Sequence, residues 1–84
     1  MKYSKQAWAQ VKGKTCDELI SALLKDGFQQ DEKTGPRIVF RHQDGRRVAI
    51  DYHPNKTYGP NLLKALLDDI GWSEADMRRL KFIK

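Results

Sequence analysis

The segment from residue 37 to residue 53 constrains the fold most, because large apolar residues recur at every second position on both sides of a short Gln43-Asp44-Gly45 sequence, at 38 and 40 and at 48, 50 and 52. Such alternation is typical of two half-buried strands joined as a hairpin. A two-residue loop would place arginines and apolar side chains on the same face. A three-residue loop with Gly45 in the left-handed region sets Arg41 opposite Arg47 and keeps the arginines on one face. We therefore predict strands at 37–42 and 47–53 in this register.

The same register predicts which hairpin side chains are buried. Val39 then faces Ala49, and Arg37 faces Asp51, on the face that carries the arginines. The other face collects the apolar residues Ile38, Phe40, Val48, Ile50 and Tyr52. A third, shorter strand is predicted at 28–31, followed by a polar turn at 32–36.

Capping signals place the helices. Thr15 and Glu18 form a capping-box pattern ahead of an apolar stripe, and Gly27 follows as a stop signal. That stripe comprises Cys16, Leu19, Ile20, Leu23 and Leu24. Gly59-Pro60 begins a second helix that ends at Gly71 and carries the stripe Leu62, Leu63, Leu66, Leu67 and Ile70. Ser73 begins a last short helix, with Trp72 and Met77 at the spacing of a hydrophobic staple.

This order of elements predicts an α+β fold. The predicted order of elements is α-β-β-β-α. The strands form a three-stranded antiparallel sheet with helices on one face, and an extra short helix follows at the C-terminus. We expect residues 1–14 to form an N-terminal arm or short helix, with Trp8 packed on the domain, and residues 15–84 to form one domain. The residues expected in the core include Leu23, Ile38, Phe40, Val48, Ile50, Leu62 and Leu66.

The positive charge is concentrated in the middle of the chain. The net charge is +5, and the stretch from Lys33 to Lys64 holds seven basic residues and only two acids, Asp44 and Asp51. Basic and acidic residues cancel in the rest of the chain. Nucleic acid is the commonest partner for such a segment, so we predict RNA binding on a basic sheet face. A solvated basic face without a partner is the alternative.

Other compositional features exclude several classes of protein. The single cysteine, Cys16, excludes an internal disulfide, and its place on an apolar stripe predicts a buried thiol. No apolar run approaches the roughly 20 residues of a membrane span, so we expect a cytoplasmic protein with no membrane partner. Two histidines and one cysteine do not make a four-ligand zinc site without carboxylates, so we expect no metal.

An ordered series of short motifs resembles the HicA toxin family. The motifs are Asp17-Glu18-Leu19-Ile20, Asp26-Gly27-Phe28, Phe40-Arg41-His42-Gln43-Asp44-Gly45-Arg46-Arg47-Val48, Tyr52-His53-Pro54-Asn55-Lys56-Thr57, Leu62-Leu63-Lys64 and Ile70-Gly71-Trp72. The resemblance spans about residues 15–83. It implies a double-stranded-RNA-binding-like fold and endonucleolytic cleavage of messenger RNA without metal or cofactor. It also implies a HicB-like antitoxin that covers the active surface.

One triplet departs from the family pattern. Gly35-Pro36-Arg37 stands where the family usually has Gly-Ser-His or Gly-x-His, so Arg37 occupies the catalytic histidine position. Arginine stays protonated and cannot take a proton from a 2′-hydroxyl, although it can hold a phosphate. His53 is a candidate replacement base, and His42 is a weaker one. The residues expected to bind RNA are Arg41, Arg46, Arg47 and Lys56.

Three hypotheses about function follow. The first is a metal-independent endoribonuclease of the HicA type, in which the arginines position RNA. The second is an RNA-binding module of the same fold whose cleavage is weakened, because arginine replaces the family histidine. The third is an interaction protein whose basic face meets only an acidic, antitoxin-like partner. For Arg37 the alternative to phosphate binding is an ion pair with Asp51, and for His53 it is a hydrogen bond at the loop edge.

Overall fold

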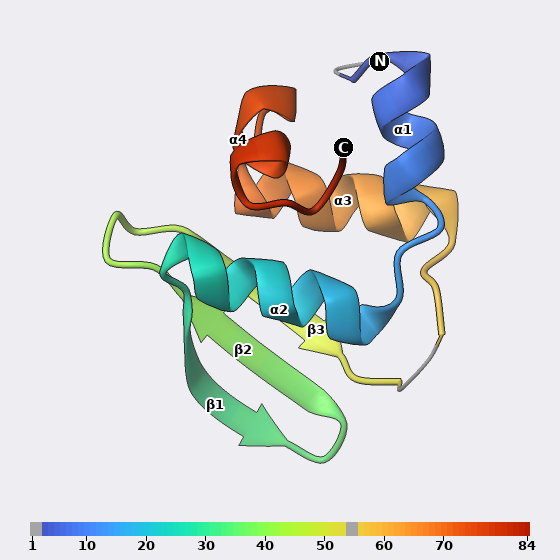
Figure 1. Cartoon of the computed structure of the whole chain (residues 1–84). Helices are drawn as coiled ribbons and strands as arrows, with labels where there is room; N and C mark the ends of the chain where they lie inside the picture. The colour runs from blue at the N-terminus through green and yellow to red at the C-terminus, as the bar shows by residue number, and fades with distance from the viewer. Residues whose placement is uncertain (1–2, 54–55) are drawn as a thin grey trace.

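The computed structural model describes residues 3–53 and 56–84 and has an α+β architecture (Figure 1). Its elements are α1 (Lys5–Val11), α2 (Cys16–Asp26), β1 (Gln29–Thr34), β2 (Arg37–Arg41), β3 (Arg47–Asp51), α3 (Pro60–Ile70) and α4 (Glu74–Arg79). The strands form one antiparallel sheet in the order β1-β2-β3. The predicted fold class is confirmed, since α2, the sheet and α3 follow the α-β-β-β-α order of a double-stranded-RNA-binding-like fold. Pro54 and Asn55 of the predicted loop, and Met1 and Lys2 of the predicted arm, lie outside the described residues.

The β2–β3 hairpin has the predicted register. Arg41 pairs with Arg47, Val39 with Ala49, and Arg37 with Asp51. The backbone N–H of His42 donates to the carbonyl of Arg46 at 2.8 Å, which leaves three residues in the turn, and Gly45 has φ +101°. Both strands are shorter than predicted, because β2 ends at Arg41 and β3 ends at Asp51.

Strand β1 differs from the prediction. It runs from Gln29 to Thr34 instead of ending at residue 31, and only Gly35-Pro36 remain as the turn to β2. All six of its residues are exposed, so the strand lacks the alternation by which the other two were recognised. Backbone pairing with β2 holds it in place, with a bulge at Asp31 between the pairs Gln30–Phe40 and Glu32–Val39.

The predicted helix boundaries are confirmed, but two leucines of the predicted stripes are not buried. Thr15 and Glu18 form the capping box, and Gly27 ends α2 with φ +104°. Gly59 caps α3, and Gly71 ends it with φ +78°. Leu24 and Leu62 are instead 53% and 51% exposed. Each lies one residue, or about 100° of helix rotation, away from a buried leucine of the stripe that faces the core.

The core joins the sheet to the helices. The hairpin contributes Ile38, Phe40, Val48 and Ile50, which pack with residues of α2 and α3 that include Leu19, Leu23, Leu63, Leu66, Leu67 and Ile70. Trp72 and Met77, predicted as a staple, are fully buried in the same core. No helix in the described part of the chain is long and apolar enough to cross a membrane.

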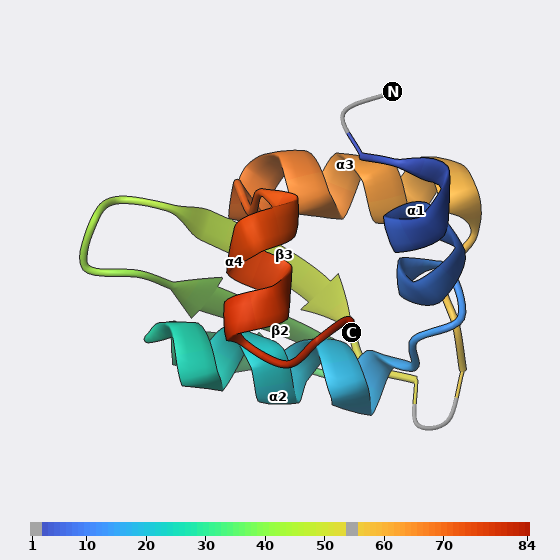
Figure 2. The same ribbon diagram turned by 45° about the horizontal axis from the view of Figure 1, so that its top comes forward.

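The N-terminal arm is a helix packed on the domain. Ala7 and Val11 of α1 are fully buried, and Trp8 packs against the core as predicted. Tyr3 donates to the carbonyl of Trp72 at 2.7 Å, and the backbone N–H of Ser4 bonds to Glu74. Figures 1 and 2 show α1 beside the start of α3, with the C-terminal segment nearby. The two ends of the chain therefore stabilise each other.

The two capping boxes predict a loss of stability in acid. Backbone N–H donation from Thr15 holds the pKa of Glu18 below its usual value, and the same bond from Ser73 lowers the pKa of Asp76. Carboxylates with lowered folded-state pKa values contribute stability above their unfolded pKa, and that stability is lost as the pH falls. We expect the free energy of unfolding to fall from about pH 4.5 downward. The double variant Glu18→Gln/Asp76→Asn should show a shallower fall in urea titrations at pH 3 to 7, and an equally steep fall would contradict this role.

Candidate functional site: the arginine face of the sheet

Three arginines share one face of the sheet, which we call the arginine face. Arg37 and Arg41 lie at the two ends of β2, and Arg47 begins β3. All three are exposed, whereas Ile38, Phe40, Val48 and Ile50 on the other face are buried. Val39, which the register places on the arginine face between Arg37 and Arg41, is buried as well. None of the three arginines belongs to the core, so their side chains are available to a partner.

The hydrogen-bond pattern brings cross-strand side chains on this face close together. Tyr52 donates its N–H to the carbonyl of Pro36 at 2.7 Å, just outside the Arg37–Asp51 pair. That pair is therefore of the non-hydrogen-bonded type, in which the Cα atoms are about 4.5 Å apart. The Arg41–Arg47 pair, four residues along β2, is of the same type. Two like charges placed opposite each other favour an anion between them.

Strand β1 supplies acidic residues that the sequence analysis placed elsewhere. The bulge directs Asp31 toward Arg41, with its Oδ2 at 3.0 Å from Nη2 and 3.2 Å from Nε. Glu32 lies opposite Val39, and Asp51 lies opposite Arg37. Three acids thus share the face with three arginines. Asp51 was predicted there, whereas Asp31 and Glu32 were not. Because residues 32–34 were assigned to a turn, their side chains were not placed on the sheet.

Arg37 and Arg47 differ from Arg41 in their charge environment. Among residues 3–53 and 56–84, neither forms an ion pair, whereas Arg41 is bonded to Asp31. The positive charge on the arginine face is therefore least neutralised at these two positions.

Arg46 was predicted to bind RNA, and the structure places it in an internal network. Its Nε bonds to Asp44 at 2.7 Å, its Nη1 donates to the carbonyl of Ile70 at 2.7 Å, and its Nη2 lies 3.1 Å from Asp26. Its guanidinium also lies over the ring of Phe28. These contacts occupy the guanidinium, so we leave Arg46 out of the arginine face.

The two histidines have different surroundings. The imidazole of His42 contacts the carbonyl of Asp26 through Nε2 at 2.9 Å and accepts the N–H of Asp44 at Nδ1. Both ring nitrogens are thus engaged, and the ring packs edge-on against Phe28, as expected for a structural residue. His53 is exposed and follows the end of β3, two residues after Asp51.

The loop that carries Lys56 is tied to the start of α2 by contacts that the sequence analysis missed. The hydroxyl of Tyr58 donates to Cys16 Sγ at 2.8 Å and lies 3.2 Å from the carbonyl of Asp51. Burial raises the pKa of Tyr58, so the phenol stays protonated. Cys16 is fully buried, as predicted, and its N–H bonds to the carbonyl of Lys56 at 3.0 Å. Lys56 itself is exposed, near the end of β3.

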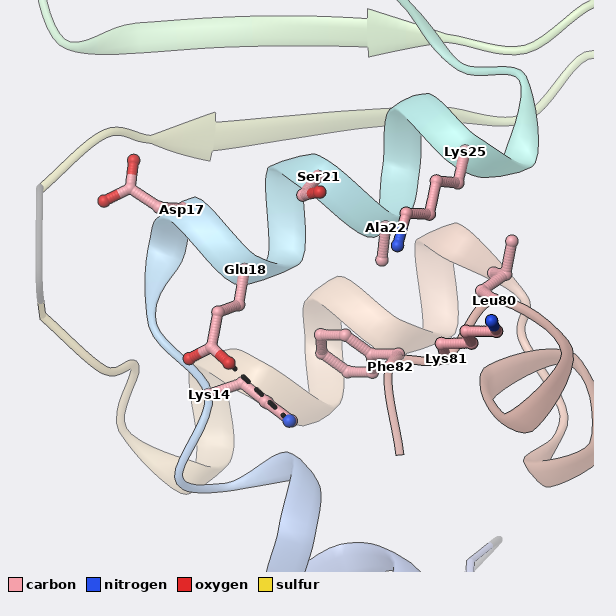
Figure 3. A pocket seen from close by; sticks show the side chains of 9 residues that line it. All are labelled: Lys14, Asp17, Glu18, Ser21, Ala22, Lys25, Leu80, Lys81 and Phe82. Atoms are coloured by element: carbon pink, nitrogen blue, oxygen red, sulfur yellow. Dashed lines mark ion pairs between the residues drawn. The ribbon is translucent and has the colours of Figure 1, made fainter. Parts of the chain in front are cut away.

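A separate hollow lies between α2 and the C-terminal segment, away from the arginine face. It has a volume of about 330 Å³, and the side chains lining it include Lys14, Lys25, Lys81 and Phe82 (Figure 3). Lys14 forms an ion pair with Glu18 there, at 3.6 Å. None of the sequence-predicted site residues lines this hollow. Within the described ranges, no three His, Cys, Asp or Glu side chains gather as ligands for a metal ion.

The sheet and the helices α2 and α3 lie in the part of the chain that matches a known protein family. A family model described as the HicA toxin of bacterial toxin–antitoxin systems matches residues 16–72, from the start of α2 to Trp72. This span includes the whole sheet and all three face arginines. No curated protein matches the chain. A toxin of such a system has a cognate antitoxin as its partner. Because the family model covers most of the domain, the chain belongs to the HicA toxin family.

Proposed function

We propose that this toxin binds messenger RNA on the arginine face and cleaves it slowly without metal, and that a HicB-like antitoxin neutralises it. The observation that carries the proposal is the set of three exposed arginines, Arg37, Arg41 and Arg47, on one face of the sheet. The resemblance to the family implies that Arg37, which lies opposite Asp51, takes the place of the family's histidine. At position 37, an arginine is suited to binding a phosphate, whereas acid–base catalysis requires a group that exchanges a proton.

The spacing of the arginine pairs supports contact with more than one phosphate. Arg37 and Arg41 are four residues apart on one strand, which corresponds to roughly 13 Å. Arg47 lies opposite Arg41 in the register and has no acidic partner among the described residues. A phosphate between Arg41 and Arg47 removes the repulsion between them, while Arg37 holds a second phosphate along the same strand. Lys56, exposed beyond the end of β3, extends the positive surface.

The same arrangement predicts that any cleavage is slow. Metal-free cleavage needs a group that takes the proton from the 2′-hydroxyl and another that protonates the leaving oxygen. The guanidinium of Arg37 stabilises negative charge on the phosphate but accepts no proton. Of the two histidines, His42 is engaged through both ring nitrogens, so His53 is the candidate base. A weakened RNA-binding module is the second candidate function, and the arginine at the family's histidine position favours it.

One assay separates the two functions. Purified protein is incubated with long single-stranded and structured RNA in EDTA, and both fragments and bound RNA are measured. Slow appearance of fragments supports the toxin nuclease, whereas binding without fragments supports the RNA-binding module. Absence of both binding and cleavage would contradict the proposal.

Removing two arginines should weaken RNA binding without unfolding the protein. We expect Arg41→Ala/Arg47→Ala to raise the Kd for RNA by more than about tenfold, because binding then neutralises fewer phosphates and releases fewer counterions. The variant should also show a smaller dependence of log Kd on log salt. The double variant Lys5→Ala/Lys12→Ala loses the same charge from exposed positions on and next to α1, and it should retain most of the affinity. Equal losses in the two variants would show that net charge, and not the arginine face, determines binding.

A further inference from the structure

An apolar groove lies between α2 and the β1–β2 part of the sheet. It has a volume of about 430 Å³. The side chains that line it are Ile20, Leu24, Ile38, Phe40 and Tyr52, with Asp17, Gln30 and Lys33 at polar positions. In Figure 1, α2 crosses in front of β2 and β3, and β1 lies below it. The groove opens on the side of the sheet to which Ile38 and Phe40 point, opposite the arginine face.

The groove differs from the rest of the surface because it includes Leu24, an exposed large hydrophobic side chain. Only two large hydrophobic side chains in the described part of the chain are exposed, Leu24 and Leu62. Leu62 lies on α3 and lines none of the groove, whereas Leu24 lines it together with the half-buried Ile20 and Tyr52. A contiguous apolar surface of this kind marks an interaction site more often than a single exposed leucine does.

The wall of the groove indicates what kind of partner fits. Strand β1 is an edge strand, paired only with β2, and all its residues are exposed. Lys33 pairs with Ile38 in the register, so it is directed to the groove side of the sheet. Within the described residues it has no acidic partner. Asp17, the acid at the groove, is already bonded to the hydroxyl of Tyr52 at 2.8 Å. The complementary partner therefore carries apolar side chains and a carboxylate.

We propose that this groove is the docking site for the cognate antitoxin, which inserts apolar side chains beside Leu24 and places a carboxylate against Lys33. A macromolecule with a polyanionic backbone does not fit an apolar groove with one free cation, whereas an amphipathic protein segment does. The groove and the arginine face lie on opposite sides of the sheet. Docking in the groove then supplies affinity, and the remainder of the antitoxin covers the arginine face. That the antitoxin inhibits RNA binding and cleavage rests on the proposed function, whereas its docking in the groove is independent of that function.

The test compares the two exposed leucines. Leu24→Asp should raise the Kd for the cognate antitoxin by at least about tenfold, through the lost apolar contact and the added charge. Leu62→Asp adds the same charge at a position of equal exposure outside the groove and should leave this Kd unchanged. Lys33→Glu should weaken binding and should reduce its dependence on salt. Circular dichroism verifies that each variant is folded, which is expected because all three positions are exposed.

RNA binding, measured on the same variants, keeps this proposal separate from the proposed function. Leu24→Asp should bind RNA like the wild-type protein, and its antitoxin affinity can be measured whether or not the protein cleaves RNA. Equal antitoxin affinities for the Leu24 and Leu62 variants would overturn the proposal. So would a loss of RNA affinity in Leu24→Asp, which would make the groove part of the RNA surface. Conversion of a dimer to a monomer with unchanged antitoxin affinity would assign the groove to self-association instead.

Discussion

Arg37→His is expected to raise RNA cleavage in EDTA by on the order of a hundredfold over the slow wild-type rate. General acid–base catalysis contributes at least this much when a titratable group replaces one that cannot exchange a proton. An imidazole with a pKa near 6.5 is well populated in its neutral form at pH 7, whereas a guanidinium is not. The measurement is the initial rate of fragment appearance under single-turnover conditions.

The position is suited to a histidine because of what lies opposite. Asp51 is the cross-strand partner of residue 37, with its side chain on the same face. A carboxylate next to an imidazole orients the ring and stabilises its protonated form, as in other acid–base pairs. Pro36 precedes the position, and its carbonyl is bonded to the N–H of Tyr52, so the backbone of the new histidine is held as in the wild-type protein.

Two variants control this experiment. Arg37→Lys keeps the positive charge and adds no group that titrates near neutral pH, so it should bind RNA and cleave no faster than the wild-type protein. His53→Ala tests the candidate base of the wild-type protein. If the wild-type protein cleaves at a rate that Arg37→His leaves unchanged, and His53→Ala abolishes this cleavage in a folded protein, the reaction centre lies at His53 and our assignment of residue 37 is wrong.

The sequence predicts those parts of the fold in which neighbouring residues show a burial pattern or a helix-capping pattern. The register of the β2–β3 hairpin follows from burial, since a slip of one residue would bury arginines. Helix boundaries follow from Thr15, Gly27, Gly59 and Gly71, because capping depends on residues adjacent in the chain. Strand β1 carries no such signal, because its six residues are all exposed and polar.

The candidate site was predicted only in part for the same reason. Arg37, Arg41 and Arg47 were placed together by the hairpin register. Asp51 was placed opposite Arg37 by the same register. The acids of β1 were missed, since Asp31 reaches Arg41 only through a bulge in a strand whose extent the sequence does not reveal. The network around Asp26 depends on contacts between residues far apart in the chain, which neither periodicity nor motif spacing reports.

Asp26 is the centre of that network. Its side chain is 8% exposed and accepts hydrogen bonds from Trp72 Nε1 at 2.9 Å and from Arg79 at 3.3 Å. It also pairs with Arg46 at 3.1 Å, and its backbone carbonyl contacts His42. A carboxylate at the C-terminal end of α2 is unfavourable for the helix dipole. Its contacts with Trp72 between α3 and α4, with Arg79 of α4 and with Arg46 of the hairpin turn therefore account for an acid at this position.

Asp26→Ala is expected to lower the free energy of unfolding by about 3 kcal/mol. The substitution leaves the fully buried indole N–H of Trp72 without its acceptor and removes a carboxylate from the half-buried Arg46. Urea titration measures the change, and an unchanged m value identifies it as a loss of stability. Asp26→Asn keeps an acceptor for Trp72 and should lose less. Asp31→Ala removes the exposed partner of Arg41, and its effect on stability should be close to zero. Equal, small effects of Asp26→Ala and Asp31→Ala would show that the network around Asp26 contributes no more than an exposed ion pair.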